Sequence, residues 1–239
     1  MRELTSVSVD PNYTIERLVT GLNAPIHLQM VRNSIYYGDS GMADGNGKLL
    51  RLTDGGEEVI AEGFTPPLTG ITYHDGAFYV SHKGTITRVT ERGEKRDIVV
   101  GLPSFGDFSN GRVTVGPDGK LYFGQGTATN SGVVGLDNRD WLLEHPYFCD
   151  YPARDIILTG ENFVTESIVE GKKEPTITGA FSPFGRKSKS GELVRHILPG
   201  SGSVLRVNPD GSNLELVAWG LRLPICGQFD AAGRLYFTN

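Results

Sequence analysis

The chain has 239 residues, a formal net charge of -5 and two cysteines, Cys149 and Cys226. The charge argues against a nucleic-acid partner, which favours a basic surface, and two cysteines are too few for a disulfide framework, although one disulfide between them is left open. No apolar run reaches the roughly 20 residues that span a membrane, so we expect no membrane partner. The N-terminus lacks the layout of a signal peptide. We therefore expect a cytoplasmic protein by default, with export left open.

The 32 glycines accompany many β-branched and aromatic residues, which is typical of short strands joined by tight turns. Taken in chain order, four segments repeat an apolar residue followed by a tyrosine. They read SIYYGDS at 34–40, AFYVSHK at 77–83, KLYFGQG at 120–126 and RLYFTN at 234–239. The tyrosines Tyr36, Tyr79, Tyr122 and Tyr236 are separated by 43, 43 and 114 residues. The third interval therefore indicates one repeat with an insertion.

Each repeat predicts four strands. One strand precedes the tyrosine strand and in three of the repeats is joined to it by a glycine-containing turn, and a third strand carries an arginine, as in LLRLTDGG at 49–56 and SVLRVNPDGS at 203–212. Four short strands in about 40–45 residues is the period of a β-propeller blade. A β-sandwich with similar strands is the alternative. Only the segment DNRDWLLEHP at 137–146 favours a helix, which Pro146 would end.

We therefore predict an all-β fold, a single incomplete β-propeller domain over residues 1–239. Its blades cover residues 20–63, 64–101, 102–220 with an insertion at 127–202, and a partial blade at 221–239. Propellers typically close a ring of about four to eight blades. Three and a half blades cannot close, so we expect the chain to be truncated at its C-terminal side, as part of a longer protein.

Propellers bind ligands over the central channel, where two sets of loops meet. These are the lead-in loops, which precede each innermost strand, and the loops between the second and third strands, one of which holds the long insertion. Polar residues on this face suit a hydrogen-bonding, sugar-like small molecule. The candidate ligand-binding residues are Asp39, Lys83, Asn110, Arg112, Gln125 and Arg222. The histidines show no metal-ligand spacing, so the residues alone predict no metal site.

Two stretches carry a family resemblance. Residues 203–224, SVLRVNPDGSNLELVAWGLRLP, and residues 111–126, GRVTVGPDGKLYFGQG, resemble the soluble quinoprotein glucose/sorbosone sugar dehydrogenases. These six-bladed propellers use pyrroloquinoline quinone (PQQ), and the resemblance covers about residues 15–126 and 200–239. It implies a divergent aldose oxidoreductase with PQQ and calcium as cofactors, although no motif by itself supports either cofactor.

The family mechanism implies four site positions in this chain. A histidine base takes the sugar hydroxyl proton while hydride passes to the quinone, and an aspartate orients the histidine. Those positions hold Phe108 and Thr127 here, the asparagine of the family's R-N-P motif is Leu223, and Arg222 alone is retained. Phenylalanine cannot accept a proton, so the expected general base is missing.

His82 and His27 are the candidate substitutes for that base. Two alternatives stand beside the oxidoreductase: a catalytically silent ligand- or carbohydrate-binding propeller and a metal-dependent, lactonase-like propeller. Each would use the same fold, so the fold alone does not choose among them.

Overall fold

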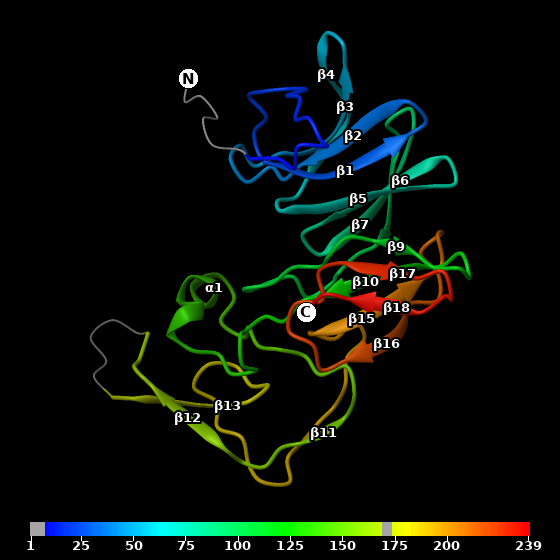
Figure 1. Cartoon of the computed structure of the whole chain (residues 1–239). Helices are drawn as coiled ribbons and strands as arrows, with labels where there is room; N and C mark the ends of the chain where they lie inside the picture. The colour runs from blue at the N-terminus through cyan, green and yellow to red at the C-terminus, as the bar shows by residue number, and fades with distance from the viewer. Residues whose placement is uncertain (1–7, 169–173) are drawn as a thin grey trace.

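The computed structural model describes residues 8–168 and 174–239, so residues 1–7 of the N-terminal segment and residues 169–173 of the predicted insertion lie outside the described residues. The described part is nearly all β-structure, in antiparallel sheets that follow one another along the chain (Figure 1). None of the helices in these residues is long and apolar enough to cross a membrane.

Two complete four-stranded sheets come first, each with its strands in chain order. The first contains β1 (Pro25–Val31), β2 (Ser34–Asp39), β3 (Gly47–Thr53) and β4 (Gly56–Phe64). The second contains β5 (Leu68–His74), β6 (Ala77–His82), β7 (Thr85–Thr90) and β8 (Lys95–Val99). Such antiparallel meanders are the blades of a propeller.

The third sheet has the same order but is interrupted by the long insertion. It contains β9 (Thr114–Val115), β10 (Leu121–Gln125), β15 (Ser203–Val207) and β16 (Glu215–Trp219). A two-stranded sheet of β17 (Gly227–Phe229) and β18 (Leu235–Phe237) follows it. The predicted fold class, an all-β propeller with three blades, part of a fourth and an insertion in the third, is confirmed. That the chain is part of a longer protein stays a prediction.

The repeated tyrosines and arginines occupy matching places in the sheets. Their cross-strand pairs are Tyr36 with Arg51, Tyr79 with Arg88, and Tyr122 with Arg206. In the third sheet, Arg206 Nη1 donates a hydrogen bond of 3.1 Å to the Tyr122 hydroxyl. Directly opposed side chains on one face of a sheet stabilise strand pairing, which gives the sequence repeat a physical basis.

The hydrophobic core lies between the sheets. In β6, Phe78 and Val80 pack in one cluster with residues of the first sheet such as Leu49, while Tyr79 packs in a second cluster with Leu121 of the third sheet. Successive side chains of a strand point to opposite faces, so one strand contributes to both clusters. The second sheet is therefore held by a neighbouring sheet on each side.

Threonine hydroxyls also join adjacent sheets at their innermost strands. Thr72 of β5 donates to the carbonyl of Val113, and Thr114 of β9 donates to the carbonyl of Gly227, each over 2.5 Å. Both threonines stand opposite a repeat tyrosine, Tyr79 and Tyr122 respectively. The same contact thus recurs from one blade junction to the next.

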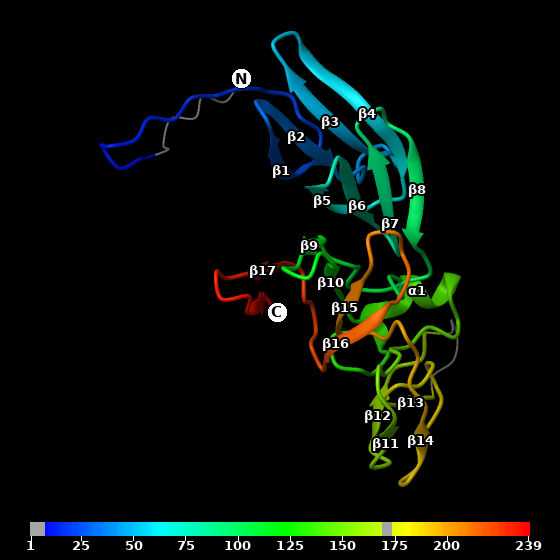
Figure 2. The same cartoon turned by 90° about the vertical axis from the view of Figure 1, so that its right-hand side faces the viewer.

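The insertion between β10 and β15 forms a small subassembly beyond the third sheet (Figures 1 and 2). It contains η1 (Leu136–Asn138), α1 (Arg139–Glu144), and two strand pairs: β11 (Ile156–Ile157) with β14 (Leu193–Val194), and β12 (Asn162–Thr165) with β13 (Thr176–Gly179). The helix predicted within residues 137–146 is confirmed. Its Leu142 packs with Val134 and Phe148 in a cluster of the insertion's own.

Candidate functional site

Three of the four positions that the resemblance implies lie together. The backbone N–H of Phe108 donates to the Thr127 carbonyl over 3.2 Å, and the backbone N–H of Thr127 donates to the Arg222 carbonyl over 2.9 Å. The Arg222 guanidinium lies 5.8 Å from the centre of the Phe108 ring, within cation–π range. The start of the insertion is therefore held between the lead-in loops of the third and fourth sheets.

A cavity of about 300 Å³ opens beside this junction, and we call it the polar pocket. Most of its lining offers hydroxyl, amide or backbone groups, with Arg222 as its cation and two aromatic rings on its wall. The lining residues are Thr127, Thr129, Asn130, Ser131, Gly132, Asp150, Phe181, Ser201, Trp219, Gly220, Leu221, Arg222 and Asn239. Such a mixture suits a small ligand rich in hydrogen-bonding groups.

The aromatic wall of the polar pocket comes from two distant segments. The Trp219 and Phe181 ring centres are 6.4 Å apart, and Trp219 Nε1 donates a hydrogen bond of 2.9 Å to the Ser201 carbonyl. Phe181 has a φ of 50°, in the left-handed region that a bulky side chain rarely adopts. Residues held in this conformation cluster at ligand sites. A backbone bond of 2.8 Å to the Gly132 carbonyl holds Phe181 there.

Asp150 organises the pocket's inner wall. Its Oδ1 accepts the backbone N–H of Ala128 over 2.6 Å, and its Oδ2 accepts both the backbone N–H and the hydroxyl of Thr129, over 3.2 and 2.6 Å. Asp150 is only 2% exposed. Because all three donors come from one short segment, Asp150 fixes residues 128–129 against residues 149–151.

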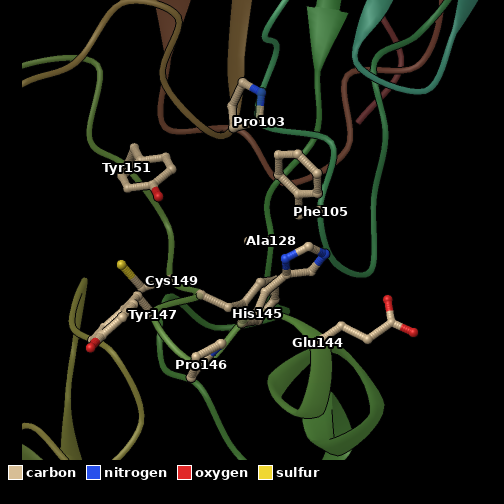
Figure 3. Close-up of a pocket in the computed structure, with 10 residues that line it drawn as sticks. Pro103, Phe105, Ala128, Glu144, His145, Pro146, Tyr147, Cys149 and Tyr151 are labelled. Atoms are coloured by element: carbon tan, nitrogen blue, oxygen red, sulfur yellow. The ribbon is translucent and has the colours of Figure 1, made fainter.

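The other side of this wall faces a second cavity of about 310 Å³, which we call the aromatic pocket (Figure 3). Side chains along the wall alternate: Thr127, Thr129 and Asp150 line the polar pocket, whereas Ala128, Cys149 and Tyr151 line the aromatic one. In Figure 3, Phe105 and His145 face Tyr147, Cys149 and Tyr151 across the space. Burial raises the pKa of the Cys149 thiol to about 11, and the Asp150 charge adds to this.

Lys83 contacts the insertion rather than the polar pocket. Its Nζ lies 4.7 Å from the centre of the Trp141 ring of α1, and that ring stacks on His145 of the aromatic pocket.

Beside the polar pocket, Asp107 Oδ2 accepts a hydrogen bond of 3.1 Å from Asn130 Nδ2. Burial and then the nearby Asp137 charge raise the pKa of Asp107.

Asn110 and Gln125 are completely buried and bonded within the fold. Asn110 Oδ1 accepts the backbone N–H of Gly84 over 2.9 Å, and Gln125 Nε2 donates to the Pro103 carbonyl over 3.1 Å. Asp39 is also buried, and its Oδ1 accepts the Gly41 N–H over 3.0 Å. These contacts give all three side chains a role in shaping loops.

His82 lies in the core between the first and second sheets. Its ring centre is 5.3 Å from that of Phe64, and its Nε2 is 2.9 Å from the hydroxyl oxygen of Thr87, which donates to Asp97 over 2.6 Å. Burial lowers the pKa of His82 to about 4. The imidazole is thus neutral at pH 7 and hydrogen-bonded away from the polar pocket.

His27 and Arg112 belong to a different cluster. Both lie on the innermost edge of the sheets, and burial followed by the Arg112 charge lowers the pKa of His27. The structure therefore places Thr127 and Arg222 in the lining of the polar pocket, with Phe108 in contact with both, and leaves the two candidate substitute bases elsewhere. Leu223 stays beside Arg222, where Asn239 Oδ1 accepts the backbone N–H groups of both residues.

Sequence reasoning missed Asp150, Phe181 and Trp219 as site residues. Trp219 stands in the same WGLR run as Arg222, so that run was a usable signal. Asp150 and Phe181 lie in the insertion, which has no counterpart in the other blades, so a comparison of the repeats could not identify them. Among residues 8–168 and 174–239, no three His, Cys, Asp or Glu side chains are grouped so that they could hold a metal ion.

No protein-family model matches the chain, and a comparison with curated protein sequences finds no relative. Solved structures similar to it include PQQ-bound aldose sugar dehydrogenase from Streptomyces coelicolor, at 16% identity and a TM-score of 0.41, covering 95% of this chain and 84% of that one. Virginiamycin B lyase from Staphylococcus aureus follows at 14% identity and a TM-score of 0.33, covering 89% and 76%. Likeness at this level carries no functional argument, and the fold rests on the strand topology.

Proposed function

We propose that the chain is a ligand-binding propeller whose polar pocket takes a small polyhydroxylated molecule of the sugar class. The observation that carries this proposal is the pairing of the Trp219 and Phe181 wall with Arg222 and the amide of Asn130 around one cavity. A sugar offers an apolar C–H face that packs on an aromatic ring. Its hydroxyl groups bond to guanidinium, amide and hydroxyl groups.

The pocket does not fit PQQ and calcium. PQQ is a tricarboxylic acid, and carboxylates are bound best by arginine forks, whereas Arg222 is the one Lys or Arg among the pocket's described lining residues. Calcium takes roughly six to eight oxygen ligands, whereas both oxygens of Asp150 already accept bonds from Ala128 and Thr129. Phe108 stands where the resemblance implies the base. The described residues thus support binding more directly than oxidation.

A quinoprotein-type sugar oxidoreductase is the second candidate. The observation that favours it is that positions 108, 127 and 222, which the resemblance assigns to the site, are joined by backbone hydrogen bonds. A titration with PQQ and calcium, followed by an assay of aldose oxidation with an artificial electron acceptor, tests it. A shift of the quinone absorbance together with turnover would favour this candidate over simple binding.

The two tryptophans allow the binding proposal to be tested directly. Trp219 lines the polar pocket, whereas Trp141 stacks near the aromatic pocket. In a Trp141→Phe protein, emission therefore reports Trp219 alone. We expect at least one member of a panel of aldoses and polyols to change this emission in a saturable way. The absence of a saturable change with every member of the panel would contradict the proposal.

Arg222→Met, made in the same Trp141→Phe background, tests the role of the guanidinium. A hydrogen bond to a charged group contributes about 1.5–3 kcal/mol, so we expect affinity to fall at least about tenfold. Arg92→Met is the matched control, because Arg92 is exposed in the β7–β8 turn. Equal affinity in the two variants would remove Arg222 from the site.

A further inference from the structure

A second cluster of reactive side chains lies on the innermost edge of the sheets, outside both pockets. It joins His27 of β1, Arg112 just before β9, and Cys226 just before β17. The Cys226 Sγ is 3.9 Å from His27 Nε2, although 199 residues separate them along the chain. Cys149 and Cys226 are both free thiols, so the Cys226 sulfur is not tied up in a disulfide.

The backbone of β1 is irregular at His27. The pairing with β2 shifts register between Ile26 and Leu28, and His27 has a φ of 48°, in the left-handed region. A bulge of this kind re-aims a side chain and is frequent beside functional sites. The regular alternation of side chains along β1 would not by itself direct His27 towards Cys226. The bulge therefore brings the imidazole to the edge of the fourth sheet.

Arg112 is fixed between the second and fourth sheets. Its backbone N–H donates to the Ile225 carbonyl over 3.2 Å, and its side chain lies so close to Gly70 that a Cβ there would contact Arg112 Cβ and Cγ. Its Nε is buried and has no hydrogen-bond partner among the described residues. The Arg112 charge acts on His27, whose pKa it lowers.

His27 Nε2 is a proton acceptor within reach of the Cys226 thiol. Burial first and the Arg112 charge second lower its pKa from the usual 6.5, so the imidazole is neutral at pH 7. A neutral imidazole has one nitrogen that accepts a proton. The nitrogen nearer the sulfur is Nε2, which is therefore the atom that would take it.

We propose that Cys226 is a nucleophilic thiol that reacts with small carbon electrophiles, with His27 as the proton acceptor. The S–H proton passes to His27 Nε2, and the sulfur forms a bond to the electrophilic carbon. With iodoacetamide the C–I bond breaks, and iodide leaves with its electron pair. This site is separate from the polar pocket and does not depend on the sugar proposal.

Cys149 provides an internal control in the same molecule. It lines the aromatic pocket, and burial raises its pKa to about 11, so little thiolate forms near neutral pH. Limited alkylation of the intact protein with iodoacetamide at pH 7, followed by peptide mass mapping, measures both cysteines at once. We expect Cys226 to react at least about tenfold faster than Cys149 and faster than N-acetylcysteine under the same conditions.

Two variants assign the roles, with far-UV circular dichroism confirming that each is folded. His27→Gln removes the proton acceptor and should slow Cys226 alkylation about tenfold. Arg112→Met removes a charge that lowers the pKa of His27, so it should not slow the alkylation. His74→Gln, at the end of β5, is the matched control and should leave the rate unchanged. A Cys226 rate no greater than that of N-acetylcysteine, or one unaffected by His27→Gln, would overturn the proposal.

Discussion

Asp150→Asn should destabilise the protein strongly although the two side chains have nearly the same shape. The carboxylate accepts three hydrogen bonds from a two-residue segment: two at Oδ2 from Thr129 and one at Oδ1 from the Ala128 backbone. An asparagine oxygen can replace only one of these positions. With the oxygen towards Thr129, the amide NH₂ faces the Ala128 N–H, so two donors oppose each other in a site that is 2% exposed.

The expected loss follows from these contacts. One charge-assisted bond is worth about 1.5–3 kcal/mol, and a buried donor left unpaired costs about 1–3 kcal/mol. We therefore expect the free energy of unfolding to fall by about 3 kcal/mol, which for a domain of this size lowers Tm by about 6–12 °C. Denaturant unfolding followed by circular dichroism, with a thermal scan, measures both quantities.

Asp54→Asn is the matched control, because Asp54 is exposed in the β3–β4 turn. The same substitution there should change the free energy of unfolding by no more than about 0.5 kcal/mol. If Asp150→Asn were no more destabilising than Asp54→Asn, the wall between the two pockets would not depend on this carboxylate, and our account of how the polar pocket is built would be wrong.

Two further predictions concern the blade junctions. A Cβ at Gly124 of β10 would overlap the Pro224 carbonyl oxygen, so Gly124→Ala should lower the free energy of unfolding by at least about 2 kcal/mol in denaturant melts. Gly55→Ala, where nothing lies within 4 Å of the added carbon, is its control. Burial lowers the pKa of His82 from 6.5 to about 4, so the unfolded state binds more protons and stability should fall as pH drops from about 6.5 to about 4. That loss, up to about 3 kcal/mol, should largely disappear in His82→Gln and persist in His74→Gln when unfolding is measured across this pH range.

The repeat in the sequence was sufficient to predict the blades. Strand alternation, glycine turns and the Tyr–Arg pairs are local features, and they recur because each sheet repeats the same contacts with its neighbours. The short helix at 139–144 was also readable, because Pro146 ends it. These features depend on residues close together in the chain or at a fixed period.

Tertiary structure decided which polar residues could form a site. Asn110 and Arg222 belong to the polar set that the sequence placed on one face, and His82 is a candidate base. Asn110 and His82 are buried within the fold, whereas Arg222 is exposed at the polar pocket. The difference arises from whether each side chain meets a neighbouring sheet or the opening beside the insertion. No local sequence pattern indicates which of these two surroundings a side chain will have.

The sequence by itself determined the class of fold, the register of its repeats and the place of the insertion, because hydrophobic periodicity and turn chemistry act over a few residues. Only the three-dimensional structure showed that Asp150 joins two segments of the insertion, that Phe181 meets Trp219, and that Cys226 lies beside His27. Those contacts join segments that are far apart in the chain, or that lie in a region without a repeat, so their partners are set by how the sheets and the insertion pack.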